Sequence, residues 1–338
     1  MMTSEKSRRG ISRSASSAFL LLFLLLAIVS TLSLIFHVKG LSWENWRALF
    51  DGSNETLSYT VWDVRLPRVL LGIILGAGLA VGGCLLQAVT QNPLSDPEIM
   101  GVNQGASLFV ASSLLFFNTD NMAAVILAAA FAGAFLGGSL IFALAFSGTY
   151  SASRLVLAGI SVSFFLGSLT TGLIVLFETE LTEILYWMAG KLSGAGWQDI
   201  RISGIIMGAA ITSALFLSKS LNILSLGEDT ARGLGISVTR TRRLSALLVV
   251  IITGCAVAAA GPIGFIGLII PHIARKVVGA DYKIVLPFSA LAGAVLLTGA
   301  DLAGQLLSYP SETPVGIITA LLGAPFFLYL LRKKKGGA

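Results

Sequence analysis

The sequence predicts an all-α membrane protein with about ten transmembrane helices per subunit. Hydrophobic residues make up 55% of the 338 residues and charged residues only 12%, about half of the charged share that is usual in a soluble domain. Apolar runs close to the ~20 residues that cross a bilayer recur along the whole chain. We therefore expect one polytopic domain over residues 18–331, a cytoplasmic N-terminal tail (1–17) and a basic cytoplasmic C-terminal tail (332–338).

The first apolar run follows a basic segment and looks like a signal peptide. It extends from Phe19 to Phe36 without a small-residue cleavage pattern at its end, so we expect an uncleaved first helix. Nine further spans follow, and glycines clustered in the second and fourth spans predict closely packed helices. The ten expected spans lie near residues 18–36, 66–86, 100–117, 122–146, 154–177, 203–218, 244–260, 262–274, 286–304 and 315–331.

The stretch 244–274 is long for one span and short for two. Basic pairs precede and follow it, at 242–243 and at 275–276. Because basic residues favour the cytoplasmic side of a membrane, the chain must go out and return between them. We expect the turn at 261–262, and the short return helix then has to be shielded by protein.

The basic residues also orient the whole chain. With the N-terminus inside, 17 of the 23 Lys and Arg residues fall in the tails and in the cytoplasmic connections. This bias follows the positive-inside rule and places both termini in the cytoplasm, in a multi-pass protein of the cell (inner) membrane. The six remaining basic residues are Lys39, Arg47, Arg65, Arg68, Lys191 and Arg201.

The sequence lacks the motifs of enzymes, ATP motors and metal sites. We find no nucleophile with a base, no paired carboxylates and no P-loop. Cys84 and Cys255 lie in apolar runs, where we expect buried free thiols, and His37 stands far from His272. We therefore expect no catalytic residue, no metal and no directly bound cofactor. No basic stretch is interleaved with aromatic residues, which argues against nucleic acid as a partner.

The centres of the expected spans carry almost no ionisable residues. Gln87, Asn103 and Gln104 are the main polar exceptions. A secondary transporter normally needs ionisable groups there to couple an ion gradient to transport. If this chain moves a solute uphill, its energy must come from a partner protein.

The stretch Leu224–Ser237 (LSLGEDTARGLGIS) is a polar interruption in the largest cytoplasmic loop. The acidic pair after its first glycine favours a helix N-terminus, and Glu228 and Arg232 have the spacing of an i,i+4 ion pair. Gly233 and Gly235 can end that helix. The stretch is either a solvated loop or a short helix that docks a cytoplasmic protein.

Six stretches in register resemble the iron–siderophore and cobalamin (FecCD-type) permease family of ABC importers. They cover the chain from about residue 60 to the end, and their combination is far more specific than any one of them. They are RLPR (65–68), GAGLAVGGCLLQAVTQNPLSDPEIMG (76–101), YWMAGKLSGAGW (186–197), LSLGEDTARGLGI (224–236), GPIGFIGLIIPHIAR (261–275) and SETPVGIITALLGAPFFLYLL (311–331).

The resemblance implies a type II ABC importer permease fold with the translocation path at the two-fold interface of a homodimer or heterodimer. It also implies two cytoplasmic ABC ATPase subunits, which would use the ATP and Mg, and an extracytoplasmic substrate-binding protein. In the family, the loop LGEDTARGLG forms the coupling helix that sits in a groove of the ATPase. The coupling residues implied here are Leu226, Gly227, Glu228, Asp229, Arg232, Gly233 and Gly235.

Arg65 and Arg68 stand three residues apart at the outer start of the second span. Cations at a helix N-terminus oppose the helix dipole, so local helix stability does not explain them. Either they anchor the helix at the membrane interface by snorkelling, or, as the resemblance implies, they receive acidic residues of the binding protein. The family often has a further arginine where Gln305 stands here. In its absence, docking of the binding protein would depend more on Arg65 and Arg68.

The resemblance also points to a cytoplasmic gate. Its expected parts are the loop after the second span, with Asn92 and Leu94, and the loop before the fifth, with Ala152 and Ser153. Asn-Pro and Asp-Pro pairs in the first loop form turns. A tight loop with no role in gating is therefore the alternative.

We expect this chain to be the permease subunit of an ATP-driven ABC importer, with a ferric siderophore as cargo and cobalamin or haem as the alternatives. A stand-alone secondary transporter would instead work without an ATPase. A membrane scaffold would bind the ATPase without substrate-dependent ATP turnover. The residues leave open which chelate is carried and whether two copies or two related chains pair.

Overall fold

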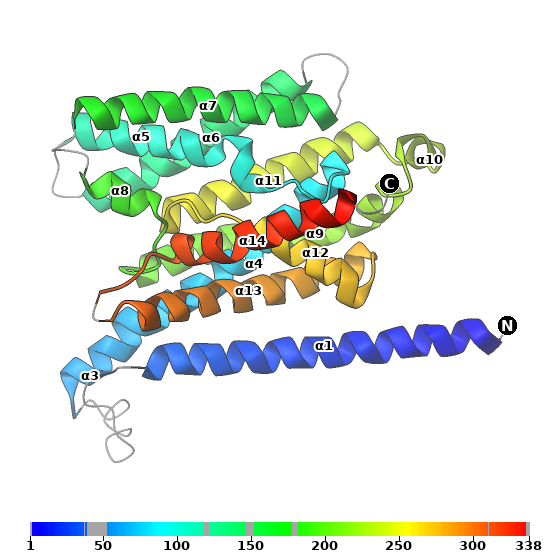
Figure 1. Cartoon of the computed structure of the whole chain (residues 1–338), viewed down its shortest axis with the longest axis horizontal. Coiled ribbons are helices and arrows are strands. Elements are labelled where there is room, and N and C mark those ends of the chain that lie inside the picture. Colours follow the sequence, from blue (N-terminus) through cyan, green and yellow to red (C-terminus); the bar gives the residue numbers. More distant parts are fainter. Residues whose placement is uncertain are drawn as a thin grey trace.

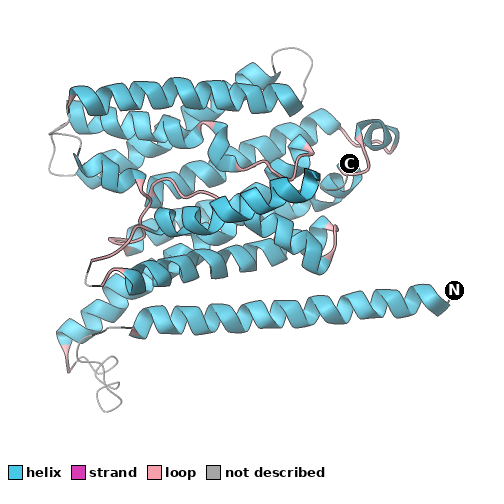
Figure 2. Cartoon of the chain, viewed as in Figure 1, coloured by secondary structure: helices cyan, strands magenta, loops and turns pink. Residues whose placement is uncertain are grey.

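The computed structural model describes residues 2–36, 38, 53–117, 122–146, 152–177, 182–309 and 311–335, and Figure 2 shows that their regular structure is helical. The predicted all-α class is therefore confirmed. In chain order the elements are α1 (Met2–Ile35), α3 (Glu55–Tyr59), the π-helix η1 (Thr60–Arg65), α4 (Leu66–Thr90), the 3-10 helix η2 (Pro97–Met100), α5 (Val102–Phe116), α6 (Met122–Phe146), α7 (Ala152–Leu176), α8 (Thr182–Met188), α9 (Trp197–Leu224), α10 (Glu228–Gly233), α11 (Val238–Ala260), α12 (Ile266–Val278), α13 (Tyr282–Leu307) and α14 (Val315–Lys335).

Each of the ten expected spans corresponds to one helix. Among the described residues, seven helices are long and apolar enough to cross a membrane, and α5 and α14 are shorter apolar helices. Helix α9 extends beyond its expected span at both ends and covers 197–224 instead of 203–218. Helix α1 also continues through most of the segment expected as a tail. Lys39 and Arg47 lie outside the described residues.

Helix α4 occupies the centre of the bundle. It packs against α9, α11, α12 and α13. Of its apolar 18-residue stretch, 78% is buried, compared with 6% for the corresponding stretch of α1, which lies at the edge of the bundle (Figure 1). The predicted close packing at glycines is confirmed. A Cβ atom on Gly76 would lie 2.4 Å from the Gly293 carbonyl oxygen, and one on Gly83 would lie 2.1 Å from the Gly267 carbonyl oxygen. Small residues let these backbones touch.

The chain turns back between α11 and α12, as predicted. Gly261 ends α11 with a φ of +72°, and α12 begins only at residue 266. With 13 residues at about 1.5 Å each, α12 is too short to cross the ~30 Å hydrocarbon core. Its first residues, 266–271, are buried in the bundle, so the expected shielding by protein is also confirmed.

A buried carboxylate caps the start of α12. The Asp96 side chain accepts the backbone N–H of Glu98 at 3.1 Å, and its carboxylate faces the backbone N–H groups of Phe265 and Leu268 at the start of α12. The first N–H groups of a helix have no partner within the helix. Because no water is available in a bilayer interior, such groups need a protein acceptor. Asp96 provides it, and the cap fixes the segment 91–98 against α12.

Substitution of Gly83 tests the contact between α4 and α12. Gly83→Ala should destabilise the purified chain by about 1–3 kcal/mol, because the added methyl group would overlap backbone that cannot move aside. The measurement is the thermal unfolding midpoint in detergent. The control is Gly208→Ala, since a Cβ atom at Gly208 meets nothing within 4 Å. Equal midpoints for the two variants would contradict the packing described here.

Candidate functional site

Helix α10 projects from one end of the bundle, and both chain termini lie at the same end (Figure 1). Gly227 and Gly235 flank it with φ angles of +105° and +77°, a region that favours glycine. Gly233 is the last residue of α10, and a Cβ atom added to it would meet nothing within 4 Å. The two positive φ angles explain why the short helix starts and stops where the sequence predicts.

Glu228 attaches α10 to the rest of the chain. Its carboxylate accepts a hydrogen bond from Arg232 at 2.6 Å, which confirms the expected i,i+4 pair, and one from Arg242 of α11 at 3.0 Å. The Arg232 side chain is 65% exposed and that of Arg242 only 7%. One carboxylate therefore joins a buried arginine to a solvent-facing one.

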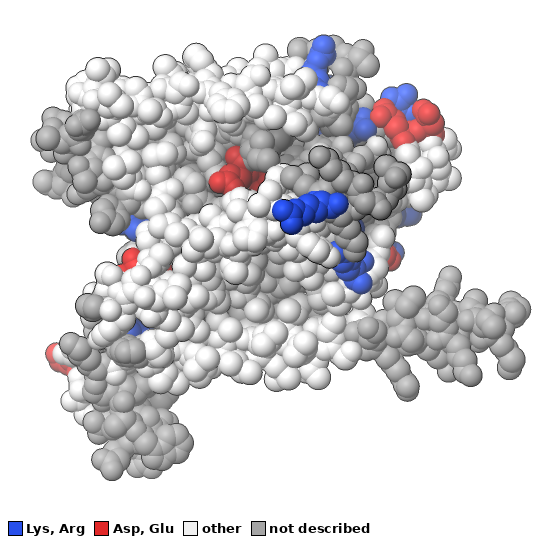
Figure 3. Space-filling view, viewed as in Figure 1, with Lys and Arg blue, Asp and Glu red and all other residues white. Residues whose placement is uncertain are grey.

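A small apolar core supports α10 from below. Leu224, Ala231 and Val238 are buried together, with Ile223 and Ile236 packed against them. Other apolar residues of the segment point outward. Leu226 is 63% exposed and Leu234 is 59% exposed, and Figure 3 shows acidic and basic side chains gathered around this projection. The projection therefore presents apolar and charged side chains side by side.

A second contact holds the end of α9 to the start of α13. The Asn222 amide donates to the Asp281 carboxylate at 2.6 Å, and the Tyr282 backbone N–H donates to the Asn222 side-chain oxygen at 2.8 Å. The backbone N–H of Lys283, together with the Asn222 amide, holds the pKa of Asp281 below its usual range. The end of α9, directly before the expected coupling segment (residues 224–237), is thus fixed to α13 by two hydrogen bonds.

The expected gate loop is hydrogen-bonded to the expected coupling segment, a contact that the sequence did not predict. Gln91 ends α4 with a φ of +50°, and its amide nitrogen donates to the Leu224 carbonyl oxygen at 3.2 Å. The same carbonyl accepts the backbone N–H of Gly227 at 3.1 Å. Gln91 therefore touches the turn that starts α10.

The rest of the gate loop is a compact turn. The Asn92 side chain accepts the Leu94 backbone N–H at 3.0 Å, and the Thr90 and Ser95 hydroxyls are 2.8 Å apart. The turn and Val156 of α7 enclose a cavity of about 60 Å³. Ala152 begins α7, and Ser153 is exposed there. The structure thus places part of the loop beside α7, near the other two expected gate residues.

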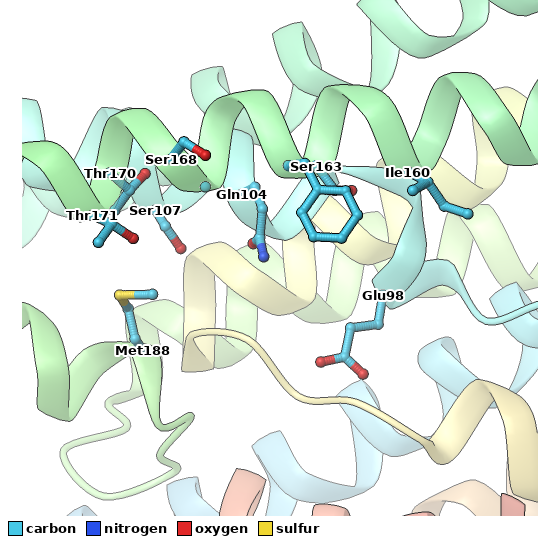
Figure 4. Close-up of a pocket in the computed structure, with 11 residues that line it drawn as sticks. Glu98, Gln104, Ser107, Ile160, Ser163, Ser168, Thr170, Thr171 and Met188 are labelled. Carbon is cyan, nitrogen blue, oxygen red and sulfur yellow. The ribbon is translucent and has the colours of Figure 1, made fainter.

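A larger cavity of about 850 Å³ opens between α5, α7 and α8 (Figure 4). Hydroxyl and amide side chains from α5 and α7 contribute to an otherwise apolar wall, and the half-buried Glu98 carboxyl group enters the cavity from η2. Sequence reasoning expected Gln104 within a span but did not expect an acidic residue from the loop to reach the bundle. The lining residues are Glu98, Gln104, Ser107, Ile160, Ser163, Phe164, Gly167, Ser168, Thr170, Thr171 and Met188.

The other polar residue expected within the second span, Gln87, is buried between α4 and α12. Its amide nitrogen donates to the Gly267 carbonyl oxygen at 2.9 Å, and its amide oxygen accepts from Arg275. Gln87 therefore links the central helix to both ends of the short return helix. It does not line the cavity.

At the opposite end of the bundle, Arg65 and Arg68 have separate protein partners. The Arg65 guanidinium donates to the carbonyl oxygens of Ser33, at 3.1 Å, and of Phe36. Arg65 therefore holds the end of α1 against the start of α4. Sequence reasoning did not foresee this contact, because the partners are about thirty residues apart in the chain.

Arg68 lies in a network of acidic side chains. It makes two hydrogen bonds of 2.8 Å to Asp301 of α13 and two of 2.8 Å to Glu312. The Arg68 side chain is 11% exposed, Asp301 is 4% exposed and Glu312 is 46% exposed. Gln305 donates to Asp301 at 2.9 Å. The position expected to hold a docking arginine in the family thus supports the acidic partner of Arg68.

Comparisons with known proteins identify the family of the chain. Residues 23–333 match the FecCD transport family. The chain is 47% identical over 285 residues to the Fe(3+)-citrate import system permease protein YfmD of Bacillus subtilis, covering 84% of each chain. It is 40% identical to the ferric enterobactin transport system permease protein FepD of Escherichia coli, covering 94% of this chain and 96% of that one.

A solved structure has the same fold. An inward-facing metal-chelate type ABC transporter superposes with a TM-score of 0.83 at 31% sequence identity, covering 94% of this chain and 99% of that chain. The expected type II ABC importer permease fold is thereby confirmed. The long apolar helices and these relatives identify a multi-pass protein of the cell membrane. The chain belongs to the FecCD transport family and is a permease subunit of an ABC importer, not itself an enzyme.

Proposed function

We propose that this permease imports a ferric chelate of the siderophore or iron–citrate class. Relatives named for Fe(3+)-citrate and for ferric enterobactin are 47% and 40% identical to it. A cobalamin import system permease protein, BtuC of Halobacterium salinarum, is 39% identical and makes cobalamin the second candidate. The feature that carries the ATP-driven function is α10, a short projecting helix fastened through Glu228 and bounded by two positive-φ glycines.

We infer that α10 and its flanking turns, residues 224–237 within a single permease domain, face the cytoplasm and dock an ABC ATPase. Arg232, Arg240, Arg242 and Arg243 in and after this segment support that orientation through the positive-inside rule. Two such ATPases would use ATP and Mg, and both termini would share their side of the membrane. The exposed residues Leu226, Asp229 and Arg232 would contact the ATPase.

A second permease chain would complete the transport path. Only 17% of the apolar 18-residue stretch of α7 is buried, and this helix borders the 850 Å³ cavity. A partner packed on α7 would close that cavity into a path whose apolar wall carries hydroxyl and amide groups. The Escherichia coli Fe(3+) dicitrate transport system has two permease proteins, FecC and FecD, each 38% identical to this chain. This pair favours a heterodimer.

Gln91 supplies a route from the ATPase to the gate. A displacement of α10 would reach Gln91 through the Leu224 carbonyl oxygen, which also accepts the Gly227 N–H. Gln91 is followed directly by the gate turn with Asn92 and Leu94, which lies beside α7. In this proposal Gln91 positions the gate and touches no cargo.

For docking of the substrate-binding protein, we propose an exchange of ion pairs at Arg68. Asp301 is buried beside Arg68, whereas the second partner, Glu312, is about half exposed. An acidic residue of the binding protein would replace Glu312 and leave the buried pair intact. Arg65 would add charge nearby, although its guanidinium also holds α1.

The transport function is tested with the permease, its ATPase and its binding protein in proteoliposomes. Iron presented outside as a radioactive ferric siderophore or ferric citrate should accumulate inside only when ATP is enclosed with the ATPase. Accumulation should survive ionophores, because no ion gradient drives it. Uptake without the ATPase, driven by an ion gradient, would refute the proposal and indicate a secondary transporter. Uptake of cobalamin but not of iron chelates would select the second candidate.

Removal of the Gln91 hydrogen bond should uncouple transport from ATP hydrolysis. Gln91→Met keeps the side-chain length but cannot donate to the Leu224 carbonyl oxygen. The number of ATP molecules hydrolysed per chelate transported should therefore rise severalfold. We expect the same result for Glu228→Gln. Gln91→Lys restores a donor and should rescue coupling. The control is Gln198→Met at an exposed glutamine of α9. A loss of complex assembly in place of a changed ratio would indicate a purely structural role.

Removal of the Glu312 charge should strengthen binding-protein docking. Glu312→Gln frees one side of Arg68 while Asp301 stays paired, so affinity should rise about fivefold, the factor that corresponds to ~1 kcal/mol for an exposed ion pair. The measurement is titration of labelled binding protein onto the complex in nanodiscs at low salt. Glu55→Gln, at an exposed acidic residue of α3, is the control. Weaker docking of the Glu312 variant would contradict the exchange.

A further inference from the structure

One face of α11 carries arginines near the start of the helix and leucines further along. Arg240, Arg243, Leu244 and Leu247 are all exposed and recur at helical spacing. Arg242 lies on another face, buried beside Glu228 of α10. The arginines of the exposed face are therefore in the first turns of α11, which follow α10, and the leucines come later along the helix.

A groove runs beside this face, between α6 and α11. Its floor is a close helix contact, since a Cβ atom on Gly138 would lie 2.6 Å from a Val250 methyl group. Above that contact is a cavity of about 330 Å³, within the size range of ligand pockets. It is lined by Phe135, Ser139, Phe142, Arg243, Leu247 and Val250.

The lining has the composition of a site for an amphiphile. Phe135 and Phe142 stand seven residues apart on α6, two helical turns along one side of the groove, and Leu247 contributes from α11. Arg243 is the charged residue of the lining. Along α11 the lining thus begins with a charged residue, Arg243, and continues with the apolar residues Leu247 and Val250.

We propose that this groove binds an anionic phospholipid of the leaflet in which α11 begins. The phosphate would lie on the Arg243 guanidinium, whose planar fork fits phosphate oxygens, and an acyl chain would lie along the two phenylalanines and Leu247. Basic pockets between transmembrane helices on the cytoplasmic side are suited to such head groups.

Charge favours an anionic lipid over a zwitterionic one. Helix α11 has no acidic residue in its first turn, and Arg240 brings a second positive charge to the same exposed face. Cations there oppose the helix dipole, so helix stability does not account for them. A choline or ethanolamine head group would place a further cation beside these arginines, whereas a phosphatidylglycerol head group would not.

The proposed lipid would lie next to the coupling segment. Arg242, the neighbour of Arg243 in the chain, holds Glu228 of α10 at 3.0 Å. A lipid on Arg243 would order the same turn of α11 that holds α10. This inference does not depend on the cargo or on the direction of transport.

The test uses the full-length chain purified in detergent and two probes with the same acyl chains, phosphatidylglycerol and phosphatidylcholine. Native mass spectrometry measures bound lipid, and thermal unfolding measures stabilisation. Phosphatidylglycerol should bind more tightly and raise the unfolding midpoint more. Arg243→Gln should weaken its binding about fivefold, the factor expected for one basic residue near an anionic lipid surface. Arg332→Gln, at an exposed arginine at the end of α14, is the matched control.

Two further variants test the groove itself. Ser139→Phe fills the cavity and should abolish preferential binding while the arginines remain. Phe135→Ala, at a 47% exposed position, should weaken binding without filling the cavity and serves if the first variant misfolds. Equal binding of the two lipids, or unchanged binding by Arg243→Gln, would overturn the site. Loss of binding in Arg243→Gln with no loss in either groove variant would also overturn it, because the arginine would then act as a surface charge only.

Discussion

The cap that Asp96 places on α12 is the contact on which the arrangement of the functional site depends. Helix α12 is too short to span a bilayer and begins inside the bundle, so its first N–H groups need a protein acceptor. The acceptor comes from the loop after α4. As a consequence that loop folds back into the bundle, which brings Gln91 to Leu224 at the base of α10 and Glu98 to the cavity wall.

This cap requires two backbones to lie unusually close together. Asp96 can reach α12 only if the end of α4 runs against it, and the contact between Gly83 and Gly267 allows that approach. Gln87, one turn beyond Gly83, donates to the Gly267 carbonyl oxygen and strengthens the same contact. In a membrane, where apolar packing against lipid is almost as favourable as packing against protein, close backbone contact and polar links hold helices together. The glycines are therefore part of the site although they touch no ligand.

The sequence predicts the parts of this fold that depend on local patterns. Apolar runs and basic flanks place all ten spans, and the glycines and charges of residues 224–237 predict a helix where α10 lies. The sequence does not predict contacts between distant residues. The pair of Arg68 with Asp301 is separated by 233 positions, so two arginines that look like one surface pair have separate partners. Glu98 was also missed, because a turn-forming loop gives no local sign that it re-enters the bundle.

The two charged networks at opposite ends of the bundle have a common plan. Arg68 has a buried partner, Asp301, and a half-exposed one, Glu312. Glu228 has a buried partner, Arg242, and an exposed one, Arg232. Breaking a buried ion pair leaves a buried charge without a partner and destabilises the fold by about 3–5 kcal/mol. An exposed ion pair contributes at most about 1 kcal/mol to stability.

This difference decides which contacts are suited to a cycle of docking and release. An incoming protein can exchange the exposed partner with little change in free energy, while the buried partner keeps the helix attached. In the proposed transport cycle the permease would engage a binding protein at Arg68 and an ATPase at α10, and the chain has such contacts at both ends. The folded chain would then remain intact through each exchange, and the energy of docking would be available to move α10 and the gate loop.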